Sequence, residues 1–289
     1  MTAALDVVIQ GILLGGLYAL FAAGLSLIFG VMRLVNLAHG DLIVLAAFLV
    51  LALVAYAGMP LPIAALVALP LMFVLGYVLQ ATVLNRALGK DILPPLLMTF
   101  GLSIIIQNGV LETFSADSRR LNAGELETAS LPLGGGIAIG VMPLITLATA
   151  VLVIVVLNQL FYRTALGRAF RAVSDDPSIA QLMGIDNRKL FAVAMGVALA
   201  VAALAGVFLG IRANFDPTIG PARLIFAFEA VIIGGLGSLW GTLAGGIVIG
   251  IAQTAGAAVN PEWQILAGHI AFLAVLVVRP RGLFPRSAD

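Results

Sequence analysis

The sequence has 289 residues, of which 62% are hydrophobic and 10% are charged, with a formal net charge of +1. A soluble domain carries roughly 25% charged residues, so this composition excludes a soluble enzyme and a disordered chain and indicates an integral membrane protein. Two lysines give no basic face for nucleic acid, and the absence of cysteine excludes thiolate metal sites and disulfides. Two histidines, His39 and His269, are too few for a dedicated metal site, so we expect no metal on this chain.

Apolar stretches long enough for membrane helices follow one another along the chain. A helix needs about 20 apolar residues to cross a hydrocarbon core of about 30 Å, and in lipid its backbone groups must be hydrogen-bonded internally. The predicted helices are Leu5–Val31, Leu42–Ala57, Leu61–Leu88, Leu93–Phe114, Val141–Tyr162, Leu190–Ile211, Leu224–Leu239, Gly241–Val259 and Gln264–Val278. The predicted fold is therefore all-α, a polytopic helix bundle that forms one transmembrane domain over residues 1–289.

Glycine makes the seventh and eighth stretches ambiguous, because it allows both close helix packing and broken helices. These glycines are Gly234, Gly235, Gly237, Gly241, Gly245, Gly246 and Gly250. Two full spans give nine crossings, which we prefer, whereas a broken or re-entrant pair gives seven or eight.

Orientation follows from the basic residues, since short loops rich in Lys and Arg stay in the cytoplasm. The loop over residues 163–189 holds five of the fifteen basic residues, and with the carboxyl-terminal tail it is predicted to be cytoplasmic. The predicted cytoplasmic set has eleven members: Arg33, Arg86, Lys90, Arg163, Arg168, Arg171, Arg188, Lys189, Arg279, Arg281 and Arg286. The four others are Arg119, Arg120, Arg212 and Arg223. We therefore expect the amino terminus outside and the carboxyl terminus in the cytoplasm.

The cytoplasmic loop 163–189 is predicted to hold two short helices. Arg168 and Arg171 share one face of the first, which ends near Ser174. Either Asp175 or Asp176 is expected to cap the second helix.

That second helix is predicted over Pro177–Met183, because Pro suits a first helical position and Gly184 suits the end. Its expected exposed apolar side chains are Ile179, Ala180, Leu182 and Met183. Such a helix suits docking into a groove of a partner protein, and the alternative is a membrane-surface connector between two spans.

Three segments carry a family resemblance: GLSLIFGVMRLVNLAHGD at 24–41, GRAFRAVSDDPSIAQLMGI at 167–185 and AVIIGGLGSLWG at 230–241. They resemble, in the same order, motifs of permeases of branched-chain amino-acid ABC importers, the LivH-like family, and the resemblance covers nearly the whole chain. It implies a permease in a bacterial inner membrane for branched-chain amino acids or related small solutes. It also implies four kinds of partner: a second related permease, two cytoplasmic ATPase subunits, an external solute-binding protein and the lipid bilayer.

The resemblance further implies that the segment from Asp175 to Gly184 contacts the ATPase. The candidate coupling residues are Asp175, Asp176, Pro177, Ile179, Ala180, Met183 and Gly184. The chain itself lacks a phosphate-binding loop: its only Gly-Lys pair, Gly89-Lys90, has Leu84 and Asp91 at the outer positions. We therefore expect a transport subunit that is not an enzyme and carries no cofactor, with ATP hydrolysis on a separate chain.

Polar residues at membrane depth are candidates for a pathway or gate, since they are costly in lipid. The candidates are Asn36, His39, Asp41, Gln107, Asn108 and Glu229. Asn36, His39 and Asp41 form either a hydrogen-bonded gate or a solvated cytoplasmic loop. Gln107, Asn108 and Gln253 are interpreted as interhelical hydrogen-bonding groups.

The importer permease has one competing hypothesis from another functional class. An autonomous channel or secondary transporter is the competing class, and it is expected to bury ion-coupling carboxylates, for which Glu229 is the one candidate.

The external loop 115–140 carries charges of both signs, which suits either docking of a binding protein or a solvated connector between two spans.

Overall fold

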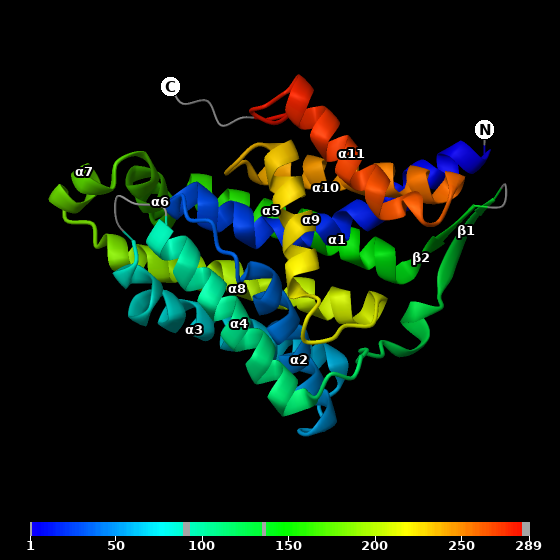
Figure 1. Ribbon diagram of the computed structural model, residues 1–289, viewed down its shortest axis with the longest axis horizontal. Helices are drawn as coiled ribbons and strands as arrows, with labels where there is room; N and C mark the ends of the chain where they lie inside the picture. Colours follow the sequence, from blue (N-terminus) through cyan, green and yellow to red (C-terminus); the bar gives the residue numbers. More distant parts are fainter. Residues whose placement is uncertain (1, 89–92, 135–136, 285–289) are drawn as a thin grey trace. The chain divides into compact units, whose positions relative to one another are not determined.

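A computed structural model describes residues 2–88, 93–134 and 137–284, and helices dominate these ranges (Figure 1). The α-helices are α1 (Thr2–Met32), α2 (His39–Ala55), α3 (Leu61–Thr82), α4 (Leu93–Phe114), α5 (Val141–Arg163), α6 (Ala165–Asp175), α7 (Pro177–Leu182), α8 (Asn187–Arg212), α9 (Gly220–Gly234), α10 (Leu239–Val259) and α11 (Trp263–Val278). Two 3-10 turns, η1 (Leu84–Arg86) and η2 (Gly124–Glu127), and two strands, β1 (Ser130–Gly134) and β2 (Ile137–Gly140), complete the set. The predicted positions of Gly89-Lys90 and Arg286 lie outside the described residues.

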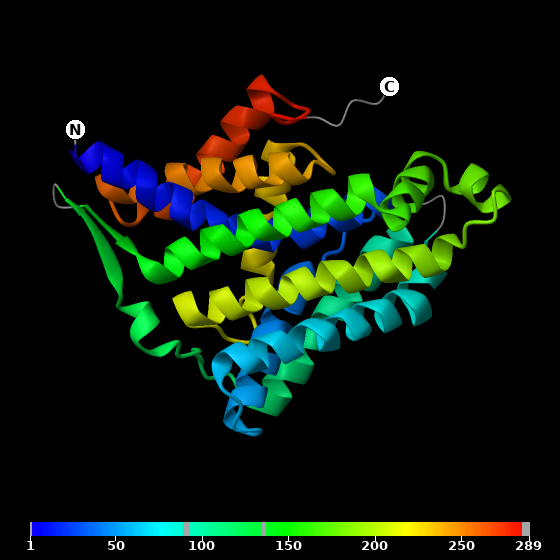
Figure 2. The same cartoon turned by 180° about the vertical axis from the view of Figure 1, so that it is seen from behind.

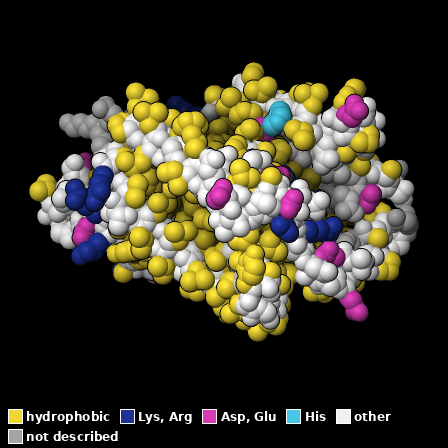
Figure 3. All heavy atoms as spheres, turned by 60° about the horizontal axis from the view of Figure 1, so that its bottom comes forward, with side chains coloured by type: hydrophobic (Ala, Val, Ile, Leu, Met, Phe, Trp, Pro, Cys, Tyr) yellow, Lys and Arg dark blue, Asp and Glu magenta, His cyan; other side chains and the backbone are white. Residues whose placement is uncertain are grey.

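Each predicted apolar stretch contains a helix. Within the described ranges, six helical segments are long and apolar enough to cross a membrane: α1, α3 with η1, α4, α5, α8 and α10. Two others, α2 and α11, are apolar but shorter, at 17 and 16 residues. The prediction of an all-α polytopic membrane protein is confirmed, whereas the number of crossings stays a prediction. Hydrophobic side chains also cover much of the face drawn in Figure 3, as expected for a surface in contact with lipid.

The segment predicted as an external loop holds a small hairpin. Strands β1 and β2 pair antiparallel, with Ser130 opposite Gly140 and Leu131 opposite Ile139, and the register is irregular between Pro132 and Gly134. Proline and glycine are depleted in strands, and the two strands are short, so sequence periodicity did not predict them.

The chain divides into two compact units. The first is Met1–Ala23, Asn122–Ile154 and Ile225–Asp289, and the second is Gly24–Leu121 with Val155–Leu224. Residues of α1, α5 and α9 belong to both units. The expectation of one permease domain over the whole chain stays a prediction.

Helix α8 is the centre of the second unit, and α2 and α3 pack on it; Figure 2 shows α3 running alongside α8. The contact is close because Gly76 of α3 has no side chain: a Cβ there would come within 2.7 Å of the Met195 carbonyl oxygen. In the first unit, α10 approaches α1 as closely, and a Cβ on Gly250 would come within 2.2 Å of the Gly11 carbonyl oxygen. Small residues of this kind are how membrane helices bring their backbones together.

Candidate functional site

Helix α6 is tied to the end of α5. Its amphipathic pattern buries Phe170 and Val173, and the ring of Phe170 lies 5.5 Å from that of Phe161. Arg171 donates to the Phe161 carbonyl oxygen and lies 5.3 Å from the centre of the Tyr162 ring. Thr164 caps the helix by accepting from the Gly167 N–H at 3.0 Å. These contacts make α6 a firm base for the short helix that follows it.

Helix α7 is capped at both ends. Asp176 Oδ1 accepts from the N–H groups of Ser178 and Ile179 at 2.8 and 3.0 Å, while Asp175 closes α6 with an exposed side chain. Of the two predicted caps, Asp176 is therefore the one used.

At the other end Gly184 has φ +86°, a conformation natural only to glycine. The N–H groups of Ile185 and Gly184 donate to the carbonyls of Ala180 and Gln181 at 3.1 and 3.0 Å, which is a Schellman motif. The predicted Gly184 stop is confirmed, with α7 ending at Leu182 and Met183 in the cap position.

Three large apolar side chains of this segment are exposed: Ile179 by 60%, Leu182 by 87% and Met183 by 78%. The prediction that Ala180 is exposed is wrong, because only 3% of it is accessible. α7 packs against α6 and α8, and this face of so short a helix points inward. The start of α8 holds α7 in place, since Asn187 Nδ2 donates to the Pro177 carbonyl at 2.7 Å.

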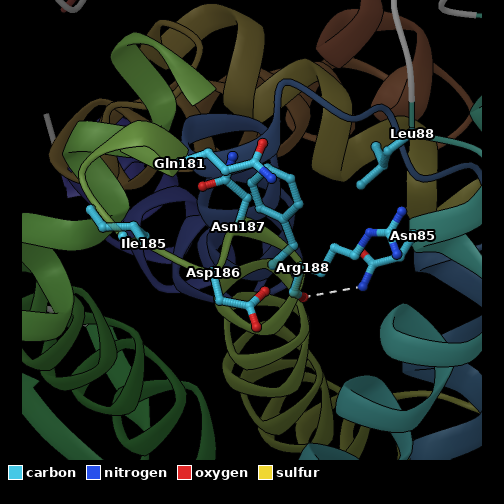
Figure 4. A pocket seen from close by; sticks show the side chains of 9 residues that line it. Asn85, Leu88, Gln181, Ile185, Asp186, Asn187 and Arg188 are labelled. Atoms are coloured by element: carbon cyan, nitrogen blue, oxygen red, sulfur yellow. Dashed lines mark hydrogen bonds between the residues drawn. The ribbon is translucent and has the colours of Figure 1, made fainter. Parts of the chain in front are cut away.

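A cavity of about 580 Å³ adjoins the end of α7 (Figure 4). Its lining residues are Asn85, Leu88, Gln181, Gly184, Ile185, Asp186, Asn187, Arg188 and Phe191. In Figure 4 Asn85 and Leu88 face Gln181 and Ile185 from the opposite side, and Asn85 Nδ2 donates to the Arg188 carbonyl at 3.1 Å. Asp186 caps α8, and the hydrogen bond from the Lys189 N–H is the main reason that its pKa lies below the ordinary carboxyl value.

The break between α1 and α2 leads into a second group of candidate residues, which we call the Asp41 cluster: Asn36, Asp41, Thr99, Ser103 and Gln107. Asn36, His39 and Asp41 are all buried, so the alternative of a solvated loop is wrong. Asp41 Oδ2 accepts from Ser103 Oγ at 2.5 Å, and Asp41 Oδ1 accepts from Gln107 Nε2 at 3.0 Å. Asp41 and Gln107 were predicted as separate candidates, and the fold brings them together.

Helix α4 supplies its part of this cluster as a stripe with a spacing of four residues. Thr99 accepts from the Leu37 N–H at 3.2 Å, one turn before Ser103 and two before Gln107. Thr99 and Ser103 were not predicted, although the spacing of four residues between positions 99, 103 and 107 in an apolar helix is a signal for one polar face. Asn108 lies off this stripe: its side chain is exposed and donates to the Ile104 carbonyl of its own helix at 2.8 Å. Among the residues that the structure describes, the predicted interhelical bond from Asn108 is therefore not formed.

The start of α9 closes the Asp41 cluster from another direction. A Cβ on Gly220 would come within 2.0 Å of Asp41 Oδ1, so only glycine fits there. Within the break itself, Asn36 Oδ1 accepts from the Ala38 N–H at 3.0 Å.

A third group lies in the first unit and is called the Glu229 cluster: Tyr18, Phe226, Glu229, Gln253 and His269. Buried Glu229 pairs with Nδ1 of His269, whose ring stacks on Phe226 with 6.0 Å between centroids. Tyr18 donates to Gln253 Oε1 at 2.5 Å, which confirms an interhelical role for Gln253.

Two buried atoms of the Glu229 cluster, Glu229 Oε2 and Gln253 Nε2, have no hydrogen-bond partner among the described residues. His269 was not predicted as a site residue. Glu229 itself indicated that such a residue was needed, because a carboxyl group at membrane depth is usually paired with a polar group on a neighbouring span.

Comparisons with known proteins agree with one another. The family model "Branched-chain amino acid transport system / permease component" matches residues 7–277. The chain is 30% identical to the high-affinity branched-chain amino acid transport system permease protein BraD of Pseudomonas aeruginosa, over 98% of this chain and 96% of BraD. It is 27% identical to the corresponding permease protein LivH of Escherichia coli K12, over 96% of this chain and 94% of LivH. Among solved structures, PsaBC from Streptococcus pneumoniae in complex with Fab has a similar fold, with a TM-score of 0.50, 14% identity, and coverage of 94% of this chain and 91% of that chain.

Proposed function

The chain belongs to the permease-component family of branched-chain amino acid transport systems, and we propose from this premise how it works in an ATP-driven importer for branched-chain amino acids or related small solutes. The complete assembly contains this chain, a second related permease, two cytoplasmic ATPase subunits and an external solute-binding protein. This chain supplies a membrane pathway and a contact for the ATPase. ATP hydrolysis takes place on the separate ATPase chains.

One observation carries the assignment of the ATPase contact. Helix α7 is capped at both ends, and yet it exposes Ile179, Leu182 and Met183. Burying a large apolar side chain contributes about 1.5–3 kcal/mol, so a partner groove that covers three of them gains enough to hold the helix. A stiff capped helix passes on the movement of that groove, whereas a flexible connector absorbs it.

The contacts within the second unit support the proposed sides of the membrane. Segments predicted to be cytoplasmic contact one another, since Arg33 bonds to Ser174 and Asn85 bonds to Arg188. Segments predicted to be external do the same, since Arg119 pairs with Phe215 across two backbone hydrogen bonds. This pattern is expected when each set lies on one face of a bundle.

We retain nine crossings as the proposed topology. α10 has 21 residues and is long enough to cross by itself, which argues against a hairpin in which α9 and α10 share one leaflet. α9, with 15 residues, spans about 22 Å at 1.5 Å per residue, so it needs flanking residues to complete a crossing.

Cysteine labelling tests this orientation without background, because the chain has no cysteine. Ser178 and Ser130 are both exposed. The Ser178→Cys variant should react with a membrane-impermeant maleimide only from the cytoplasmic side, and Ser130→Cys only from outside. The reverse pattern would overturn the topology.

Leu182→Asp tests the ATPase contact, because Leu182 is the most exposed of the three apolar side chains and its replacement leaves the buried side of α7 unchanged. Ala180 is unsuitable for this test, since a larger side chain at a buried position disturbs folding itself. In the complete assembly, Leu182→Asp should reduce both co-purification of the ATPase and ATP-driven uptake. The matched control is Leu126→Asp in the predicted external loop, where the side chain is also exposed and the ATPase contact should be unaffected. If Leu182→Asp assembles and transports as the wild type does, α7 is only a connector.

A further inference from the structure

Helices α1 and α6 meet at their carboxyl-terminal ends within the second unit. Ser174 Oγ donates to the Gly30 carbonyl oxygen at 2.7 Å, and Arg33 Nη2 donates to the Ser174 carbonyl oxygen at 3.3 Å. Both acceptors lie in the last turn of a helix, where carbonyl groups lack a donor from the next turn. Each helix end therefore supplies a donor to the other, and we call Gly30, Arg33 and Ser174 the Ser174 link.

The partial charges of the two helix ends explain why an arginine is needed at this contact. A helix carboxyl terminus carries roughly half a negative charge, so two such ends repel each other unless a cation lies between them. Arg33 is positioned for that role, because it directly follows α1 and its guanidinium reaches the last turn of α6. Its backbone has φ +51°, which is uncommon outside glycine, and surrounding contacts must hold it in this strained conformation.

The Ser174 link lies between the exposed helix α7 and the break between α1 and α2. On one side, α7 begins at Pro177, three residues after Ser174. On the other side, Arg33 opens the break that ends at His39 and carries Asn36 and Leu37. From the break, hydrogen bonds continue to α4 through Thr99, and at the start of α2 through Asp41. The link thus joins the exposed helix to the buried polar cluster through two sets of hydrogen bonds and the short stretches of backbone that connect them.

We propose that the Ser174 link transmits displacement of α7 to the break between α1 and α2 and so to the Asp41 cluster. Ser174 and Arg33 are positioning residues for transport: they touch neither substrate nor nucleotide. This inference depends on the proposed function, in which α7 contacts the ATPase, and adds the route by which that contact reaches the membrane interior.

The test uses the complete transporter in proteoliposomes, with the ratio of ATP hydrolysed to substrate imported as the measurement. Ser174→Ala removes the donor to Gly30, and it should raise that ratio about fivefold, the factor by which loss of one hydrogen bond shifts an equilibrium. Ser174→Thr keeps the hydroxyl and should restore the wild-type ratio. The matched control is Ser26→Ala, one turn earlier in α1, which removes a buried hydroxyl that has no hydrogen-bond partner among the described residues and should leave the ratio unchanged.

A second measurement follows the break directly. Val35 lies in the break and is half-buried, so the Val35→Cys variant reports its accessibility to maleimide. Trapping the ATPase with vanadate should change the labelling rate of this variant, and adding Ser174→Ala should abolish the change.

The outcomes separate the inference from the proposed function. If the wild-type assembly does not import substrate with ATP, the proposed function fails. If it does, and Ser174→Ala keeps both the normal ratio and the labelling change, only the link is overturned. An unchanged labelling rate in the wild type also overturns it. Should Ser174→Ala fail to assemble, Arg33→Gln decides by the same two measurements, since it removes the donor from the other side.

Discussion

Two buried carboxyl groups, Asp41 and Glu229, are held in different ways. Both oxygens of Asp41 accept hydrogen bonds from side chains of α4, and glycine backbone packs directly against the carboxylate. Glu229 has one partner, His269, whose side chain is 38% exposed, and its second oxygen has no hydrogen-bond partner among the described residues. The Asp41 carboxylate is fully hydrogen-bonded, although Asn36 Nδ2 of the same cluster has no hydrogen-bond partner among the described residues. The Glu229 cluster is open, because its carboxylate keeps an unused acceptor.

This difference indicates different roles in one permease. A buried carboxylate whose two oxygens both accept hydrogen bonds is held in one geometry, and breaking those bonds is costly. A network with an unused acceptor and an accessible partner is able to exchange contacts at lower cost. We therefore interpret the Asp41 carboxylate, with Ser103 and Gln107, as a fixed point between helices and the Glu229 cluster as the place where local rearrangement is easier.

The largest expected effect comes from adding one methyl group beside each cluster. In Gly220→Ala the new Cβ meets Asp41 Oδ1 and backbone, neither of which is able to move away. We expect a loss of about 3 kcal/mol in stability, at the upper end of the cost of overpacking. In Gly268→Ala the new Cβ comes within 2.9 Å of Gln253 Cγ and Nε2 and meets no backbone atom that close, so the loss should be smaller, about 1 kcal/mol. Thermal unfolding of the purified variants measures both, and equal losses would contradict the comparison.

The next largest difference in stability is expected when each buried carboxyl group is replaced by an amide of the same shape. Asp41→Asn places an NH₂ group against a donor, either Ser103 or Gln107, and should cost about 1–3 kcal/mol. Glu229→Gln has room for its NH₂ group at the position of the unpaired Oε2 and should cost little. Unfolding midpoints of the two variants, compared in the same detergent, check this order. A larger loss for Glu229→Gln shows that the Glu229 cluster is the more rigid one.

Tyr18→Phe sharpens the comparison from within the Glu229 cluster. The change removes the hydrogen bond to Gln253 Oε1 and should cost about 0.5–1.5 kcal/mol, because it is a neutral hydrogen bond in a cluster that is already incompletely satisfied. Tyr56→Phe is the control, since Tyr56 is 80% exposed at the end of α2 and its hydroxyl should contribute nothing measurable. A loss at Tyr18 above that of Asp41→Asn contradicts the assignment of an open cluster.

The smallest effect is expected at Asp186, an exposed carboxylate that serves as the reference for the two buried ones. Its pKa is lowered, chiefly by the Lys189 N–H hydrogen bond, so its ionised form contributes stability above the ordinary pKa of 3.8. That contribution disappears as the pH falls through the lower pKa of the folded state. The difference in unfolding midpoint between wild type and Asp186→Asn should therefore be small at neutral pH and vanish in acid. A difference that grows in acid contradicts this sign.

Much of the fold was predictable because apolar length is a strong signal in lipid. All nine apolar stretches contain helices, and the cap at Asp176 and the stop at Gly184 follow from local backbone chemistry. The error at Ala180 has the opposite origin. Whether one small side chain of a six-residue helix faces inward depends on α6 and α8, and these contacts are tertiary.

The candidate site was only partly predictable, for a related reason. A single polar residue within an apolar span is easily recognised in the sequence. Its hydrogen-bond partner is not, because that depends on which helix faces pack together. Asp41 and Gln107 were chosen without knowledge that they bond, and His269 was left out because its partner lies 40 residues away. Helix periodicity identified Thr99, Ser103 and Gln107 as one stripe only after α4 was known to face α2.

The exposed side chains of α7 also bear on how the transporter is made in the cell. Until a partner covers them, as proposed for the ATPase, Ile179, Leu182 and Met183 of a newly inserted copy are exposed, and such apolar groups in water attract chaperones and proteases. An unassembled copy should therefore be short-lived, and simultaneous synthesis with its ATPase should lengthen its lifetime. Under the proposed contact, α7 thereby couples the lifetime of this chain to the supply of its ATPase.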